Sequence, residues 1–465
     1  MWSCCRRPAR PSTSSPASRS AATRSRRSSP AAPRSSGRRG PTVRSPSPSG
    51  ARAVSSSIAV PRILLLFSVL ALTVIGCVMI YSASIAEAVE AASLAEADSP
   101  VNVDASALSY LTDQLVFVVL GVIAAALLWK VIPLRVWQGP FLWVIWGLAV
   151  VLLILTAAIG TEDLGAQRWV NLGPVSLQPS EFAKIAFALM AARIFHDYRE
   201  GSLSALAMVA QAFVLIGIPV LFLFVSQSDL GTTVIIAVGI LAVMWMGEAP
   251  LKLIGGICVL GLIFVIAATA FTGYRSDRML FLNPWNDGEE GLGKGFQLIH
   301  SYYAFSQGGL FGVGLGNSSE KYYLPEAETD FIFAIIGEEL GMVGALVVVA
   351  LFVLLLYAGM RVADSASDGF GGMVAGSCTL MLVFQAFLNI GCVVGLLPTT
   401  GKPLPFVSSG GSSLIATFIM VGLILAVSQD AGRPSIYERR RADLRVVRAA
   451  GPAPSGWDGG FDRRR

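Results

Sequence analysis

Apolar stretches recur along this chain from Ile58 to Val427, and many approach the roughly 20 residues that a helix needs to cross a bilayer. They make 54% of the 465 residues hydrophobic and leave only 14% charged, whereas a soluble domain carries about 25% charged residues. We therefore predict an all-α polytopic membrane protein. Its ten predicted transmembrane helices cover residues 58–81, 111–130, 140–160, 179–196, 205–225, 229–247, 251–271, 330–358, 370–397 and 404–428.

Basic residues set the predicted orientation, because lysine and arginine concentrate in cytoplasmic loops. The segments 1–57 and 431–465 are both polar and basic, and the first holds 12 arginines and no acid. We expect two cytoplasmic tails, the first of them disordered because its composition cannot build a core. The membrane domain then covers residues 58–430. The long connection 272–329, between the seventh and eighth spans, becomes a large extracellular loop.

An acidic cluster opens the eighth predicted span, in the sequence LPEAETDFIFAIIGEELG. A carboxylate in hydrocarbon costs several kcal/mol or more. Helical steps of 100° per residue put four small residues on the same face as Asp330: Ala334, Gly337, Gly341 and Ala345. We predict that Asp330 faces the bundle interior near the outer surface, with Glu326 and Glu328 in the preceding loop. The alternative is a carboxylate that only caps the helix.

Two further polar segments lie at predicted outer helix ends. In QRWVNLGPVSLQPSEFAK, Arg168 falls in an external connection, and Glu181 and Lys184 are three residues apart, so they can pair on one helix face. A purely structural ion pair is the alternative there. In SQSDLGTT, Ser228 or Asp229 can cap a helix, and capping alone is the favoured interpretation.

A lysine precedes the last predicted span, in GLLPTTGKPLPFVSSGGSSL. Lys402 lies between two prolines and before a serine- and glycine-rich run whose backbone amides and hydroxyls can receive an anion. Taken together, the cations Arg168, Lys184 and Lys402 and the candidate base Asp330 predict one external site. Such a site suits a substrate with an anionic head and a lipid tail.

The segments quoted above, together with GFQLIHSYYAFSQGGLFGVGLG, resemble the shape, elongation, division and sporulation family, which comprises FtsW, RodA and SpoVE. The resemblance covers residues 58–430, with the motifs in the family's order. It implies a ten-helix peptidoglycan glycosyltransferase that polymerises lipid II, inverts the anomeric centre and releases undecaprenyl pyrophosphate. The aspartate of the family's PE-x-x-TDF motif is its catalytic residue, which points to Asp330 here.

The resemblance also implies substrate-binding residues. They are Arg168, Glu181, Lys184, Gln297, Ser301, Glu326, Glu328, Lys402, Ser408 and Ser409. Two positions depart from the family's pattern: Glu328 stands where histidine is common, and Ser409 where tyrosine is common. We expect the extra acid Glu328 to raise the pKa of Asp330 through like-charge repulsion.

The family also implies partners and a location. We expect lipid II, a class B penicillin-binding protein and other division proteins as partners, with no nucleic acid, at the cytoplasmic membrane and the division septum. The LLPTTGK sequence favours a division-type over a RodA-type elongation polymerase. No cofactor is certain; a divalent cation, Mg²⁺ or Mn²⁺, remains open. A lipid II flippase is the rival, but the polar motifs cluster at predicted external ends, which favours the enzyme.

Overall fold

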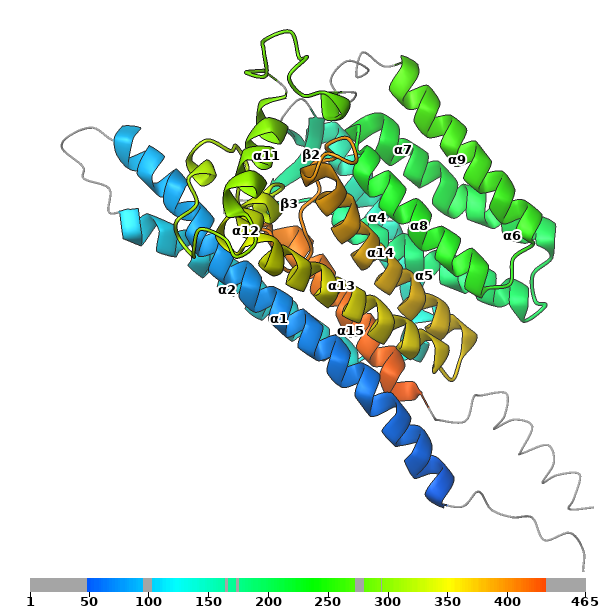
Figure 1. Ribbon diagram of the computed structural model, residues 1–465. Coiled ribbons are helices and arrows are strands. Elements are labelled where there is room, and N and C mark those ends of the chain that lie inside the picture. Colours follow the sequence, from blue (N-terminus) through cyan, green and yellow to red (C-terminus); the bar gives the residue numbers. More distant parts are fainter. Residues whose placement is uncertain are drawn as a thin grey trace, which may run out of the picture. The chain divides into compact units, whose positions relative to one another are not determined.

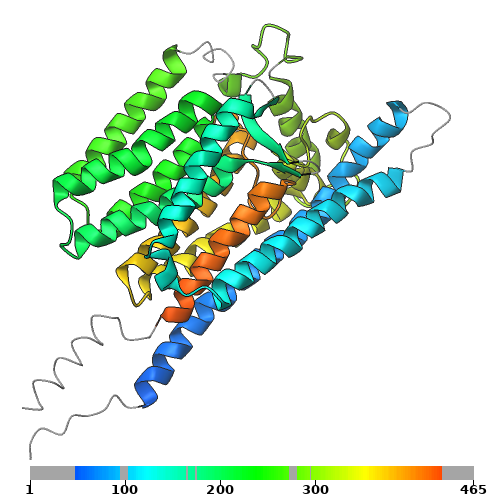
Figure 2. The same cartoon turned by 180° about the vertical axis from the view of Figure 1, so that it is seen from behind.

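The computed structural model describes residues 48–94, 103–163, 166–172, 175–271, 280–293 and 295–431. Helices dominate it, as Figures 1 and 2 show. The α-helices are α1 (Pro48–Leu94), α2 (Val103–Lys130), α3 (Leu134–Trp137), α4 (Phe141–Ile159), α5 (Pro179–Arg199), α6 (Ala205–Ala212), α7 (Ile218–Gln227), α8 (Leu230–Met246), α9 (Leu251–Phe271), α11 (Phe296–Gly308), α12 (Ile332–Glu339), α13 (Gly341–Asp364), α14 (Gly369–Val393) and α15 (Gly411–Asp430). Shorter helical turns are η1 (Phe213–Gly217), η2 (Leu280–Leu282) and η3 (Glu320–Tyr322).

Seven segments of the described chain are long and apolar enough to cross a bilayer. They are Ile58–Ala86, Leu108–Lys130, Phe141–Ile159, Ala205–Gln227, Gly341–Asp364, Gly369–Val393 and Gly411–Asp430. The shorter apolar helices α8 and α9 and the more polar α5 correspond to the three other predicted spans. The prediction of a helical multi-pass membrane protein is confirmed. The first helix begins at Pro48, earlier than expected, and residues 1–47 and 432–465 of the predicted tails lie outside the described part.

The centre of the bundle is formed by α14 and α15. In their most apolar windows 78% and 83% of the residues are buried, against 22% for α2 and α4. Helix α14 packs against α13, α8 and α5, and α15 packs against α2. In both views α1 and α2 run along one side of this centre, and α6 to α9 lie on the other (Figures 1 and 2). The central helices therefore contact protein on most faces, while the outer ones keep a lipid-facing surface.

A small sheet departs from the all-helical expectation. Strands β1 (Thr161–Asp163), β2 (Ala166–Leu172) and β3 (Val175–Leu177) form an antiparallel sheet in the order β1-β2-β3, between α4 and α5. Val170 pairs with Leu177 and is 6% exposed. Pairing satisfies the backbone groups of a segment too short for another span, and it gives Arg168 on β2 a fixed position.

The predicted eighth span, 330–358, is broken in the structure. Asp330 lies in a turn before α12. The helix is interrupted at Leu340, and α13 begins at Gly341. Gly341 has a φ of 68°, and a Cβ there would lie 2.3 Å from the backbone nitrogen of Gly312. Since the loop after α11 packs into this break, the predicted single helical face from Asp330 to Ala345 is wrong.

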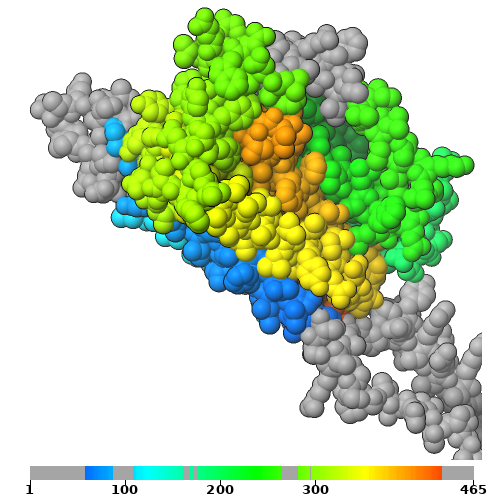
Figure 3. Space-filling view, viewed as in Figure 1, coloured from blue at the N-terminus to red at the C-terminus, as the bar shows by residue number. Residues whose placement is uncertain are grey.

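The last span also begins later than predicted. Helix α15 starts at Gly411, whereas helix was expected from residue 404. Pro403 and Pro405 lack the backbone N–H groups that a helix interior needs, so residues 400–410 form an irregular loop. Figure 3 shows an orange patch, the colour of residues near 400, at the surface beside the yellow-green region that carries α11 and α12, although most of the 400–410 loop is buried.

Candidate active site

Asp330, the predicted catalytic acid, lies at a junction of three segments. Its side chain is partly exposed, in the turn that precedes α12. Gly401 has a φ of 64°, and the point where a Cβ would stand on it lies 3.5 Å from Oδ2 of Asp330 and 4.0 Å from Nη1 of Arg168. The carboxylate, the guanidinium and the 400–410 loop therefore meet. A side chain at Gly401 would occupy the space between the two charged groups.

The backbone of this junction is tied by one amide. Asn389 on α14 donates from Nδ2 to the carbonyl oxygens of Asp330 and of Lys402, both at 2.8 Å. The side chain is 2% exposed, so water competes little for these bonds. A polar residue of a membrane helix thus helps to set the distance between the turn carrying the acid and the 400–410 loop.

The environment raises the pKa of Asp330 to about 6. Burial is the largest cause, and the negative charge of Glu326 adds to it, while Lys402 and Arg168 oppose the shift. The like-charge neighbour named by this environment is Glu326, whereas the sequence pointed to Glu328. Glu328 is 8% exposed, and its carbonyl accepts a 2.9 Å hydrogen bond from the backbone N–H of Ser409.

Arg168 is held by the end of a neighbouring helix. Its Nε donates to the carbonyl of Gln227 at 3.1 Å, and its Nη2 donates to that of Ser228 at 2.9 Å. Ser228 has a φ of 48°, which turns the chain out of α7. Carbonyls at a helix C-terminus are the acceptors that a cation prefers. The guanidinium is thus oriented by backbone and still partly exposed beside Asp330.

The predicted pairing of Glu181 and Lys184 is confirmed. Their charged atoms are 2.8 Å apart, and both side chains are 0% exposed. Lys184 also donates to Oε1 of Gln385 at 2.7 Å, and Gln385 donates to the carbonyl of Pro403 at 3.0 Å. The pair is therefore connected to the 400–410 loop through the side chain of Gln385. Because Lys184 is enclosed, the geometry does not support its expected direct contact with a substrate anion.

Lys402 points inward as well. Its Nζ lies 2.8 Å from Oδ2 of Asp229, with side-chain exposures of 0% and 1%. Asp229 also accepts from the backbone N–H of Thr232 at 3.0 Å, which confirms the predicted cap of α8. Burial alone would raise the pKa of Asp229, but Lys402, Arg168 and the Thr232 N–H together hold it well below its usual range. The ion pair was missed from the sequence, where Asp229 was interpreted as a cap alone.

The two acids at the end of α12 hold a loop. Glu338 accepts from the hydroxyl of Ser318 and, at 2.8 Å, from the backbone N–H of Ser319. Glu339 accepts a 2.6 Å hydrogen bond from Ser82 on α1 and lies 3.8 Å from Lys321. Each carboxylate therefore anchors the glycine-rich segment between α11 and α12, which explains two acids inside an apolar run.

The remaining predicted residues fall in two groups. Ser408 and Ser409 lie in the loop beside Glu328, with Ser408 accepting from the backbone N–H of Leu404 at 2.8 Å. Ser301 is fully buried on α11 and donates to the carbonyl of Val393 at 2.7 Å, so it joins two helices. Gln297 is half-buried one turn earlier on α11.

Glu326 is exposed, with a φ of 58°, and accepts a 2.7 Å hydrogen bond from the hydroxyl of Thr329. Asn389 and Gln385 were not predicted, although amides inside an apolar span are the available signal. Among the described residues, no three His, Cys, Asp or Glu side chains are grouped to hold a metal ion.

These features define a membrane-embedded bundle with a carboxylate and a guanidinium side by side at one end. The model of the family described as "Cell cycle protein" (FtsW, RodA and SpoVE) matches residues 62–432. The chain belongs to this family.

Individual relatives agree. The "Probable peptidoglycan glycosyltransferase FtsW" of Geobacter metallireducens is 38% identical over 370 residues, 79% of this chain and 94% of that protein. The "Peptidoglycan glycosyltransferase MrdB" of Escherichia coli K12 is 41% identical over 303 residues, which cover 64% of this chain and 80% of that protein.

A solved structure shares the fold. A chain in the work titled "Structural coordination of polymerization and crosslinking by a peptidoglycan synthase complex" superposes with a TM-score of 0.60 at 27% identity. The match covers 79% of this chain and 98% of that one. The match leaves little of the other chain outside the shared fold.

Proposed function

We propose that this protein is a peptidoglycan glycosyltransferase that polymerises lipid II. The observation that carries the proposal is the partly exposed Asp330, whose raised pKa suits proton transfer, beside a guanidinium held by backbone carbonyls. The names of the FtsW and MrdB relatives give peptidoglycan glycosyltransferase as their activity. A lipid-linked substrate fits a site at the end of an apolar bundle, because its tail can stay in the membrane.

The chemistry is a single inverting displacement. A sugar 4-hydroxyl of one lipid II attacks the anomeric carbon of the growing lipid-linked chain, and undecaprenyl pyrophosphate leaves with the bonding electrons. Asp330 accepts the hydroxyl proton as the new bond forms, and a base with a pKa near 6 is largely ionised at neutral pH. One displacement converts the α-linked donor into a β-linked product.

The leaving pyrophosphate needs cations. Arg168 is the protein cation that the geometry offers, since Lys184 and Lys402 are enclosed in ion pairs. We propose that the two lysines act indirectly, by holding the 400–410 loop against Asp330. A divalent cation bound through the substrate's own phosphates is a further proposal. It predicts that a chelator abolishes polymerisation and that Mg²⁺ or Mn²⁺ restores it.

We further propose a class B penicillin-binding protein as the partner, because the matched solved chain is part of a complex that couples polymerization and crosslinking. The site would face outward at the cytoplasmic membrane, with both termini cytoplasmic, as the basic tails suggest. The LLPTTGK sequence supports a division role at the septum over elongation. Depletion of the protein would then give filaments, whereas loss of an elongation enzyme would give round cells.

The decisive experiment is polymerisation of lipid II by the purified full-length protein, with and without a co-purified class B partner whose own transpeptidase is inactivated. We expect glycan strands in the presence of the complex and none from the partner alone. A parallel assay follows lipid II movement across vesicles that contain the protein. Transport without any polymer would replace the enzyme with a flippase.

A further inference from the structure

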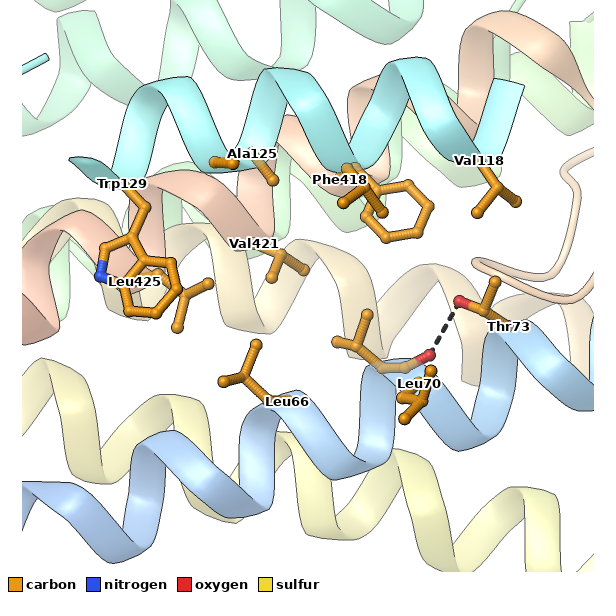
Figure 4. Close-up of a pocket in the computed structure, with 12 residues that line it drawn as sticks. Leu66, Leu70, Thr73, Val118, Ala125, Trp129, Phe418, Val421 and Leu425 are labelled. Carbon is orange, nitrogen blue, oxygen red and sulfur yellow. Dashed lines mark hydrogen bonds between the residues drawn. The ribbon is translucent and has the colours of Figure 1, made fainter. Parts of the chain in front are cut away.

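An open apolar groove runs between α1, α2 and α15, outside the proposed active site. Its volume is about 350 Å³, within the range of small-molecule sites. Twelve side chains line it: Leu66, Val69, Leu70, Thr73, Val118, Val122, Ala125, Ala126, Trp129, Phe418, Val421 and Leu425. Figure 4 shows them converging from the three helices.

The lining offers a ligand almost no polar contact. Its one hydroxyl, on Thr73, donates to the carbonyl of Val69 at 2.8 Å, as the dashed line in Figure 4 shows. All other lining residues except Trp129 are aliphatic or phenyl side chains. The part of a ligand that lies in the groove is therefore a hydrocarbon chain.

One end of the groove is basic. In Figure 4 Trp129, Leu66 and Leu425 lie at this end, and Thr73, Val118 and Phe418 lie at the other. The ammonium of Lys130 stands 3.7 Å above the Trp129 ring. Arg62 is one helical turn before Leu66, and it donates to Ser428, nearly one turn after Leu425. Two cations therefore flank the same end.

A polar group at this end lacks a partner. The indole Nε1 of Trp129 is buried and has no hydrogen-bond acceptor among the described residues. Arg62 is only partly buried, and its two hydrogen bonds to Ser428 use two of the five N–H groups of a guanidinium. An anionic oxygen at the mouth of the groove would meet both cations, and the indole N–H lies beside the ammonium of Lys130.

The opposite end leads toward the active site. Phe418 contacts Phe406 of the 400–410 loop, with ring centroids 5.6 Å apart, and Gly76 on α1 lies against Phe406 and Val407. The substrate's pyrophosphate belongs at that end, beside Asp330. The basic groups at the far end therefore suit the head of a second lipid, because one lipid head cannot lie at both ends.

We propose that this groove binds an anionic phospholipid, with an acyl chain along α2 and the phosphate among Arg62, Trp129 and Lys130. Basic sites between membrane helices at a cytoplasmic surface are known to hold anionic headgroups. This binding goes beyond the proposed reaction. It would fasten α1 and α2 to α15 and so stabilise the wall that adjoins the 400–410 loop.

The test titrates phosphatidylglycerol and phosphatidylcholine with identical acyl chains into the detergent-purified full-length protein and follows the melting temperature. We expect apparent affinity for phosphatidylglycerol to exceed that for phosphatidylcholine about tenfold. Each of Arg62→Gln and Lys130→Gln should weaken the phosphatidylglycerol affinity about fivefold. Lys252→Gln, an exposed lysine at the start of α9, is the matched control and should change nothing.

Two further variants separate the headgroup from the chain. Trp129→Phe keeps an aromatic side chain and removes the N–H, so it should weaken phosphatidylglycerol alone, while Ala126→Phe fills the groove and should weaken both lipids. Because Arg62 also binds Ser428, Lys130→Gln is decisive if Arg62→Gln misfolds. Equal affinity for the two lipids, or unchanged affinity in Lys130→Gln, overturns the proposal. Preferential binding of a polyprenyl phosphate over phosphatidylglycerol also overturns it, and assigns the groove to the substrate's tail.

Discussion

Asp229 and Asp330 lie near the same two cations, Lys402 and Arg168, and yet their pKa values move in opposite directions. Asp229 accepts hydrogen bonds from Lys402 at 2.8 Å, from the Thr232 hydroxyl at 2.7 Å and from the Thr232 N–H at 3.0 Å. The carboxylate of Asp330 accepts none from the described residues, and Glu326 repels its ionised form. The charge of Lys402, in direct contact with Asp229, is the largest of the effects that lower its pKa, and the hydrogen bonds add to it, whereas Asp330 has no such contact and faces the like charge of Glu326.

Removing the proton acceptor should have the largest effect. Asp330→Asn keeps the size of the side chain but cannot accept a proton, so the polymerisation rate should fall by about 10² to 10⁴. Expression and melting temperature should stay near wild type, because the side chain has no hydrogen bond to lose. The control is Glu289→Gln, which removes an exposed carboxylate from the segment before α11. A wild-type rate in Asp330→Asn would show that Asp330 is not the proton acceptor.

For Asp229, the structural acid, we expect loss of its partner to lower the stability of the protein. Lys402→Met leaves Asp229 buried without its partner, which should cost about 3 to 5 kcal/mol of stability. The drop in melting temperature measures it. The double variant Asp229→Asn/Lys402→Met removes both charges and should recover part of the loss. If the double variant is less stable than Lys402→Met, the pair does not act as a unit.

Removal of the Asn389 side chain, which links the Asp330 turn to the 400–410 loop, should have an intermediate effect on activity. Asn389→Ala removes both hydrogen bonds that join the Asp330 turn to the loop at Lys402. Misplacing the acid should lower kcat about tenfold and leave its pH midpoint in place. Ser377→Ala is the matched control, since Ser377 is buried on the same helix and its hydroxyl donates to Gly239 at 3.1 Å, away from the site. A loss of activity equal in both variants would indicate a general packing defect.

The smallest effect tests the cause of the raised pKa. Activity should rise with pH through about 6, because only ionised Asp330 accepts a proton. Glu326→Gln removes the repelling charge, which should lower the pKa and move the rising limb to lower pH. Glu328→Gln should leave the limb in place. A pH–rate profile of lipid II polymerisation for the three proteins distinguishes these outcomes, and a limb moved only by Glu328→Gln would contradict the assignment.

Much of the candidate site followed from the sequence because acids and cations are rare in apolar spans. Asp330, Arg168 and the Glu181–Lys184 pair could be found in this way, the last from helical spacing alone. The partners of Lys402 and Asn389 could not, because Asp229 is 173 residues from Lys402 and Asp330 is 59 residues from Asn389 along the chain. Local spacing contains no information about such contacts.

The sequence by itself determined that this chain spans a membrane many times. Apolar runs of bilayer length are stable as helices in the hydrocarbon core of a membrane, and they are not stable when exposed to water. It also determined which charged residues are exceptional. Only the tertiary structure decided what each charge does. Lys184 and Lys402, expected to face substrate, are enclosed by Glu181 and Asp229. The reason is that a charge in low dielectric acts through the few groups that touch it, and those groups are chosen by packing between distant segments.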